Sequence, residues 1–233
     1  MPIPILRYSQ IADPTEQSAL LRSQTVYPSN FRIQMRRLKS LGFTGLSLRD
    51  LKPYLYGEKS GPVFGITFDN GFHSIHVNVL ETLQELRFTA TGYFVANQVG
   101  GSSISRPTHV GPRERYMSRV EMLEWALMGH EVGAHSLDHV RLTEASPMEA
   151  RRHITSGRYE LEDILGNSVD SFSYPYGDVS KYIRTIVEEA GYVSAATTFS
   201  GRVLPGDDML RLPRQTVEYA DSWLSVLCKC AIG

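Results

Sequence analysis

Three short polar segments contain residue types that can carry out hydrolysis. The first is the tripeptide DNG at residues 69–71, which follows the apolar run VFGITF. The second is HSLDH, in which His135 and His139 are four residues apart. On a helical turn this spacing places two imidazoles on one face, where they can hold one divalent metal ion. The third is SYPYG at residues 173–177, in which Tyr174 to Gly177 follow the short predicted strand SFS.

Two histidines at this spacing are often incidental, so the metal hypothesis depends on a third ligand. A catalytic zinc ion commonly has three protein ligands and one open position for water. Asn70 or Asp69 can supply the third ligand, and a carboxylate that does not bind the metal can accept a proton from the activated water. We therefore expect Asp69 as the base, Asn70 near the metal and Gly71 in a tight turn. The alternative is an Asx turn, which Asp-Asn-Gly favours whatever the chemistry.

Alternating strands and helices must position these segments. Short apolar runs predict strands at residues 63–68, 88–95, 131–135, 171–175 and 192–198. Helical spacing predicts helices at residues 31–43, 75–86, 118–129, 146–165 and 179–191, two of which begin with a Ser and a Glu in capping-box register. This order favours an α/β fold of parallel units that closes, or nearly closes, as a barrel.

The three polar segments each follow a predicted strand. In barrels of parallel strands the chemistry lies at the carboxyl ends of the strands. The segments are far apart in the sequence, yet this rule places them on one face. Their shared position is the strongest structural argument for an active site.

The motifs TFDNG, HSLDH and SYPYG, in this order, resemble the first three motifs of the polysaccharide deacetylases, the NodB-homology group or carbohydrate esterase family 4. The stretch FRIQMRRLKSLGFTGLSLRDL resembles the segment before the first motif in the subgroup with poly-N-acetylglucosamine deacetylases. The resemblance runs from about residue 3 to residue 217. It implies a distorted (β/α) barrel of the NodB-homology type, formed by residues 1–233 as a single catalytic domain. It also implies metal-dependent removal of N-acetyl groups from an amino-sugar substrate.

The resemblance assigns roles to individual residues. Asp69 matches the catalytic base of the family, and Asn70 stands where the family has a metal-binding Asp. His135 and His139 match its two histidine ligands. Imidazole and oxygen ligands suit zinc, with cobalt, nickel or manganese as alternatives. Because the Asn70 amide carries no charge, metal affinity should be lower than with Asp.

Three further residues gain expected roles from the resemblance. Tyr176 matches the tyrosine of the third motif, whose backbone N–H would stabilise the oxyanion together with the metal. Pro175 and Tyr176 are expected to contact the substrate. Arg214, in LRLPRQTV, resembles a late arginine that orients the base, and a surface ion pair is the alternative.

The chain also departs from the family pattern. Ser173 stands where the third motif often carries Arg, and the early Tyr-His pair reads Tyr8-Ser9. No histidine after residue 153 matches the late Leu-x-His that supplies the general acid. His73 and His76 are candidate substitutes, and solvent-facing helix histidines are the alternative.

Composition excludes several other classes of protein. The 233 residues are 42% apolar and 21% charged, with a net charge of −1, which provides no electrostatic footprint for nucleic acid or an anionic membrane. No signal-peptide pattern and no membrane-spanning apolar run is seen, so a cytoplasmic protein is expected. Cys228 and Cys230 form no disulfide framework. The expected partner is an N-acetylated carbohydrate, and the sequence does not indicate the oligomeric state.

Two other functions remain open from the sequence. A catalytically silent relative that binds carbohydrate or a partner would explain Asn70, Ser9 and the missing late histidine together. Metal-free relatives that open cyclic amides are a weaker alternative, because both ligand histidines are retained. Metal occupancy and acetate release distinguish these functions.

Overall fold

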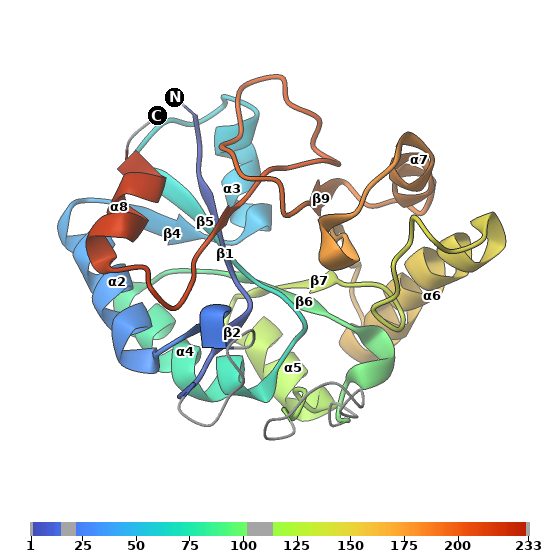
Figure 1. Ribbon diagram of the computed structural model, residues 1–233, viewed down its shortest axis with the longest axis horizontal. Coiled ribbons are helices and arrows are strands. Elements are labelled where there is room, and N and C mark those ends of the chain that lie inside the picture. The colour runs from blue at the N-terminus through green and yellow to red at the C-terminus, as the bar shows by residue number, and fades with distance from the viewer. Residues whose placement is uncertain (1, 15–21, 102–113, 232–233) are drawn as a thin grey trace.

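The computed structural model describes residues 2–14, 22–101 and 114–231. Its centre is a parallel sheet of eight strands that curls into an incomplete barrel (Figure 1). The strands are β1 (Ile5–Tyr8), β4 (Thr44–Leu46), β5 (Val63–Phe68), β6 (Thr91–Phe94), β7 (Glu131–Ala134), β8 (Ser171–Ser173), β9 (Ser194–Ala196) and β10 (Gln215–Thr216). They follow the order β10-β1-β5-β6-β7-β8-β9, and β4 pairs with β5. A separate parallel pair consists of β2 (Gln10–Ile11) and β3 (Thr25–Val26). The predicted α/β barrel is confirmed.

Helices connect the strands and lie around the sheet (Figure 1). They are α2 (Pro28–Ser40), α3 (Leu48–Leu55), α4 (His73–Leu86), α5 (Arg119–Leu127), α6 (Pro147–Leu165), α7 (Lys181–Glu189) and α8 (Trp223–Ala231), with 3₁₀ turns η1 (Ala96–Gln98) and η2 (Pro175–Gly177). Within the described ranges, no helix is both long and apolar enough to cross a membrane.

The predicted helix starts follow from local hydrogen bonding. Ser118 and Glu121 form a complete capping box at the start of α5, and Ser146 and Glu149 form another at α6. In each, the serine side chain accepts a bond from the third helical N–H while the glutamate accepts one from the capping residue, which satisfies two otherwise unpaired donors. The strand predicted at residues 88–95 is shorter, since only the four residues of β6 pair with neighbours.

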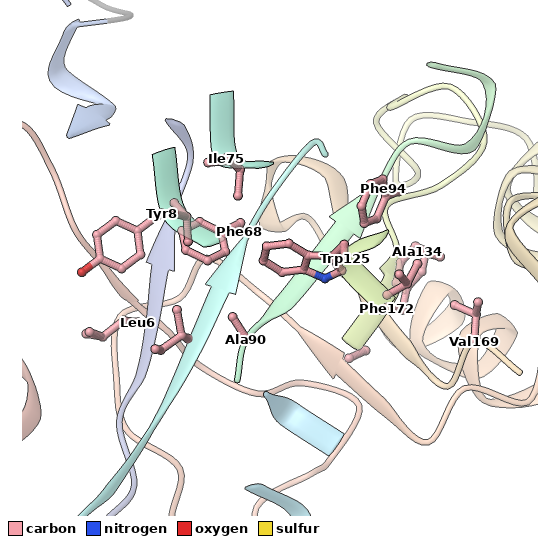
Figure 2. Close-up of a cluster of buried hydrophobic side chains, with 14 of the residues drawn as sticks. Leu6, Tyr8, Phe68, Ile75, Ala90, Phe94, Trp125, Ala134, Val169 and Phe172 are labelled. Atoms are coloured by element: carbon pink, nitrogen blue, oxygen red, sulfur yellow. The ribbon is translucent and has the colours of Figure 1, made fainter. Parts of the chain in front are cut away.

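The hydrophobic core fixes the end of β5, the strand that leads to Asp69. All six residues of β5 are buried. The Phe68 ring packs edge-on against Trp125 from α5, with ring centroids 6.0 Å apart, and against Tyr8 from β1 (Figure 2). The Tyr8 hydroxyl donates to Gln34, so Tyr8 belongs to the core. Rings of this size bury large apolar areas and hold the strand end rigidly.

One segment joins the two sides of the curled sheet. Leu212 pairs with Ala196 of β9, and β10, only three residues further on, pairs with β1. Arg214 lies between these two pairings and is fully buried. The closing segment of the barrel therefore positions Arg214 inside the molecule.

Candidate functional site

The three polar segments meet at the carboxyl edge of the sheet, as the strand-end rule predicted. The DNG segment follows β5, His135 follows β7, and η2 follows β8. Ser173 connects all three. Its hydroxyl donates to the Asp69 carboxylate at 3.3 Å, and its carbonyl oxygen lies 2.7 Å from His135 Nδ1.

Asp69 is a buried carboxylate held by Arg214. Arg214 donates to both Asp69 oxygens, at 2.8 and 3.0 Å, and its Nε donates to the Thr197 carbonyl at 2.8 Å. Such a two-pronged pair fixes the plane of the carboxylate. Because Arg214 is fully buried, the alternative of a surface ion pair is wrong. Its role in orienting a catalytic base remains a prediction.

Arg7 is a second cation at Asp69, which the sequence analysis missed. Its Nε lies 2.5 Å from Asp69 Oδ2, at the carboxyl end of β1. Burial by itself raises the pKa of Asp69, but the charges of Arg214 and Arg7 outweigh burial and hold that pKa far below its ordinary value. Asp69 is therefore ionised at any physiological pH. A lone charged residue in the apolar strand ILRY was the signal that could have revealed Arg7.

His135 has the geometry and protonation state of a metal ligand. It is 3% exposed, and its Nδ1 donates to the Ser173 carbonyl, which leaves the Nε2 lone pair unprotonated. Burial, followed by the neighbouring His139, lowers the pKa of His135 to about 3. The ring is therefore neutral near pH 7, as metal binding requires.

The second histidine comes close through an irregular loop and not through a helical turn. The His139 and His135 ring centroids are 4.8 Å apart. Ser136 and His139 have φ values of 64° and 54°, so the helical basis of the spacing argument was wrong although the rings do meet. The loop packs on α6 where Gly157 leaves room, because a Cβ there would lie 2.9 Å from the Leu137 nitrogen. Non-glycine residues with positive φ are strained and concentrate at functional sites.

Asn70 and Gly71 form the tight turn that was expected after β5. Their φ values are 77° and 72°, and Asn tolerates this region better than most residues. A Cβ on Gly71 would lie 2.6 Å from Phe94, so only glycine fits. Asn70 thus follows the ionised Asp69 directly in the chain, and its side chain is a neutral amide. Two imidazoles and an amide oxygen would suit a divalent metal by ligand type.

Tyr176 forms the opposite border of the site, next to His139. Its φ is 62°, and its ring packs on the His139 ring at 4.7 Å. Arg141, another residue that the sequence analysis missed, lies 4.2 Å from the Tyr176 ring centroid and pairs with Asp178. Among the described residues, none accepts a hydrogen bond from the Tyr176 backbone N–H. Pro175 is buried at the start of η2, while Tyr176 is partly exposed.

The two serines that depart from the family pattern, Ser173 in β8 and Ser9 after β1, differ in their contacts. Ser173 takes part in the Asp69 network, whereas the Ser9 hydroxyl is buried with no partner in the described part of the chain. His73 and His76, the candidate acids, both lie against α5. They pair with the carboxylates of Glu121 and Glu124, at 2.9 and 3.0 Å.

Comparison with known proteins agrees with this architecture. The polysaccharide deacetylase family model matches residues 56–195. YxkH of Bacillus subtilis (strain 168), a polysaccharide deacetylase by name, is 22% identical over 217 residues, which are 92% of this chain and 71% of YxkH. The peptidoglycan-N-acetylglucosamine deacetylase PgdA of Listeria monocytogenes is 33% identical over 134 residues, 57% of this chain and only 25% of PgdA.

Solved structures share the fold at low sequence identity. The polysaccharide deacetylase BC0361 of Bacillus cereus superposes with a TM-score of 0.84 at 23% identity, covering 99% of this chain and 69% of BC0361. The deacetylase PplD of Streptococcus pyogenes gives 0.85 at 20% identity, covering 99% of this chain and 98% of PplD. The family match covers more than half of the chain, from before β5 to β9. The chain therefore belongs to the polysaccharide deacetylase family.

Proposed function

We propose that the chain is a metal-dependent hydrolase that removes the N-acetyl group from an amino-sugar substrate, with residues 1–233 as one catalytic domain. The observation that carries this proposal is the buried Asp69 carboxylate, fixed by Arg214 and linked through Ser173 to the His135–His139 pair. A base linked to a pair of imidazoles, of which the buried His135 is neutral, is the kind of arrangement that metal-assisted amide hydrolysis uses.

Asn70, His135 and His139 are the residues that would hold the metal. When bound, a divalent ion, zinc by ligand preference, would lower the pKa of a water molecule and polarise the acetamide carbonyl. The other steps belong to the chain. Asp69 accepts the proton of the attacking water, and the Tyr176 backbone N–H donates to the oxyanion that develops on the carbonyl. When the C–N bond breaks, acetate is released and the sugar amine takes up a proton, which the protonated Asp69 can supply.

The two arginines give Asp69 a defined orientation and a weak basicity. A carboxylate whose pKa is held far down accepts protons poorly from ordinary water. It suffices when the water is itself acidified, which is why the low pKa of Asp69 is consistent with a metal-dependent reaction. Arg214 and Ser173 would act as positioning residues, since both bind the carboxylate of Asp69.

Acetate release from oligomers of N-acetylglucosamine tests the proposal. The metal-stripped protein is reloaded with zinc, and acetate is measured by a coupled assay. Asp69→Asn should lower the rate at least about a hundredfold, since general-base catalysis contributes on that scale. Asp163→Asn, an exposed change on α6, is the matched control. Equal rates for Asp69→Asn and the wild type would contradict the proposed base.

A catalytically silent relative that binds carbohydrate is the second candidate. One observation favours it: Asp69 faces two guanidinium groups, and Asn70 adds no negative charge to the metal position. Such a positive environment weakens the binding of a divalent cation. Failure to release acetate from any N-acetylated sugar, together with carbohydrate binding, would favour this candidate.

A further inference from the structure

A second group of metal-ligand residues lies where α4 and α5 begin. His73 and His76 are on the first turn of α4, and Glu121 is on the first turn of α5. One potential ligand atom from each residue lies within 4.8 Å of the others, and His73 Nδ1 is 2.9 Å from Glu121 Oε1. Two imidazoles and one carboxylate form a ligand set that zinc commonly uses, with a fourth position for water.

Local hydrogen bonds hold the carboxylate in place. Glu121 Oε2 accepts from the Ser118 backbone N–H at 2.8 Å and from its hydroxyl at 3.0 Å. These bonds use Oε2, and Oε1 faces His73. Burial raises the pKa of Glu121, but the bonds from Ser118 and Arg115 outweigh burial and lower it to about 2. The two bonds from Ser118 therefore orient Glu121 as an oxygen ligand.

Backbone pairing ties the two helices together at this point. The His73 N–H donates to the Arg115 carbonyl at 2.8 Å, and the Met117 N–H donates to the Gly71 carbonyl at 2.9 Å. The strand-like contact between Phe72 and Tyr116 lies between these bonds. The separation between the α4 histidines and the α5 glutamate is thus set by the backbone and not only by side-chain rotamers.

A cation already lies between the ligands. One terminal nitrogen of Arg115 is 2.6 Å from Glu121 Oε1 and 2.5 Å from His73 Nδ1. The guanidinium thus lies at the point where a metal ion would meet both His73 Nδ1 and Glu121 Oε1. The Arg115 side chain is 48% exposed and can move into solvent without opening the core. His76 has Glu124 3.0 Å from its Nε2, a carboxylate of the kind that commonly orients metal-bound imidazoles.

We propose that His73, His76 and Glu121 form a second binding site for a divalent transition metal, in which the Arg115 guanidinium occupies the cation position until the metal displaces it. Zinc matches the ligand set best, because imidazole and carboxylate together suit it. The bound ion would join the start of α4, directly after the DNG turn, to the start of α5. It is separate from the His135–His139 position.

Calorimetric titration of the metal-stripped full chain with zinc tests the second site. A variant carrying His135→Ala and His139→Ala isolates it, and this variant should still bind one zinc ion. Adding His73→Gln and His76→Gln should abolish that binding. The proposal is overturned if the first variant binds no zinc, or if the added glutamines change nothing. If the variant with His135→Ala and His139→Ala binds no zinc, the second site is refuted. That result would not contradict the proposed deacetylase function, which depends on the His135–His139 position.

Three single substitutions guard against loss of folding. Glu121→Gln keeps the capping box, since Gln serves in that position, and it should weaken zinc binding about tenfold or more because the charged ligand is lost. Arg115→Gln removes the competing charge and should tighten binding about tenfold, whereas Arg115→Lys keeps the charge and should change it less. Unchanged affinity in both Glu121→Gln and Arg115→Gln would overturn the proposal.

Discussion

The two histidine pairs of this protein lie in opposite electrostatic environments. His135 and His139 are held in an irregular loop close to the buried Asp69–Arg214 pair. His73 and His76 lie on a regular helix, partly exposed, and face Glu121 and Glu124. The pair proposed as the ligands of the catalytic metal is thus the one next to a carboxylate that two arginines already neutralise. Two histidine pairs of the same residue type are therefore expected to differ in metal affinity, because neighbouring charges add to the effect of the ligands.

Removing the buried arginine should have the largest effect on stability. Arg214→Met leaves Asp69 buried with only Arg7 as its cation, and uncompensated buried charge destabilises a protein by about 3–5 kcal/mol. Urea denaturation measures the loss. Arg151→Met, at an exposed pair with Glu189, is the control and should change stability by less than about 1 kcal/mol. Similar losses in both variants would contradict the distinction between buried and exposed charge.

A third histidine, which is buried, tests how burial contributes to the loss of stability at acid pH. His130 is 3% exposed, and neither ring nitrogen has a partner among the described residues. Burial, with Arg49 nearby, lowers its pKa to about 4, while an unfolded histidine titrates near 6.5. The unfolded chain therefore binds a proton first as the pH falls. The contribution of neutral His130 to the free energy of unfolding is therefore complete above about pH 6.5 and is lost as the pH falls towards 4.

His130→Phe should remove this part of the acid sensitivity. Between pH 7.5 and pH 4.5, the variant should lose about 2 kcal/mol less free energy of unfolding than the wild type. Urea denaturation at the two pH values gives the difference. Asn167→Gln, an exposed change that involves no titratable group, is the control and should retain the wild-type dependence. An equally steep loss in His130→Phe would show that the acid sensitivity arises elsewhere.

Adding a carboxylate at residue 70 should make the charge around the His135–His139 pair more like that around the His73–His76 pair. Asn70→Asp is expected to tighten zinc binding at the His135–His139 position at least about tenfold, since it adds a charged ligand. Calorimetry in a His73→Gln background isolates this position. Asn167→Asp, an exposed change of the same type, should have no effect. Unchanged affinity in Asn70→Asp would place residue 70 outside the metal's reach.

The smallest effect on stability is expected at the Arg115–Glu121 ion pair, in the absence of metal. Arg115→Gln breaks a partly exposed ion pair, and such pairs contribute less than about 1 kcal/mol. Thermal or urea denaturation of the metal-free protein should therefore match the wild type closely. A large loss would mean that Arg115 is a structural residue, not a cation that can be displaced.

The sequence predicted the features that depend on neighbours along the chain. Both capping boxes, the six residues of β5 and the turn at Asn70-Gly71 follow from local patterns and were found where expected. Parallel strands then place their carboxyl ends at one edge, so the meeting of the three polar segments was also predictable. The spacing of His135 and His139 indicated proximity, but the helical reason for it was wrong.

Only the tertiary structure revealed what surrounds the base. Arg7 is 62 positions from Asp69 and Arg214 is 145 positions away, and both reach it because β1, β5 and the closing segment are neighbours in the barrel. A local pattern does not record which side chain fills a space between strands. The contact of Arg115 with His73 and Glu121 likewise depends on how α5 is joined to the DNG turn. The sequence by itself determined the elements and the reactive residue types, whereas long-range packing decided which charges face them.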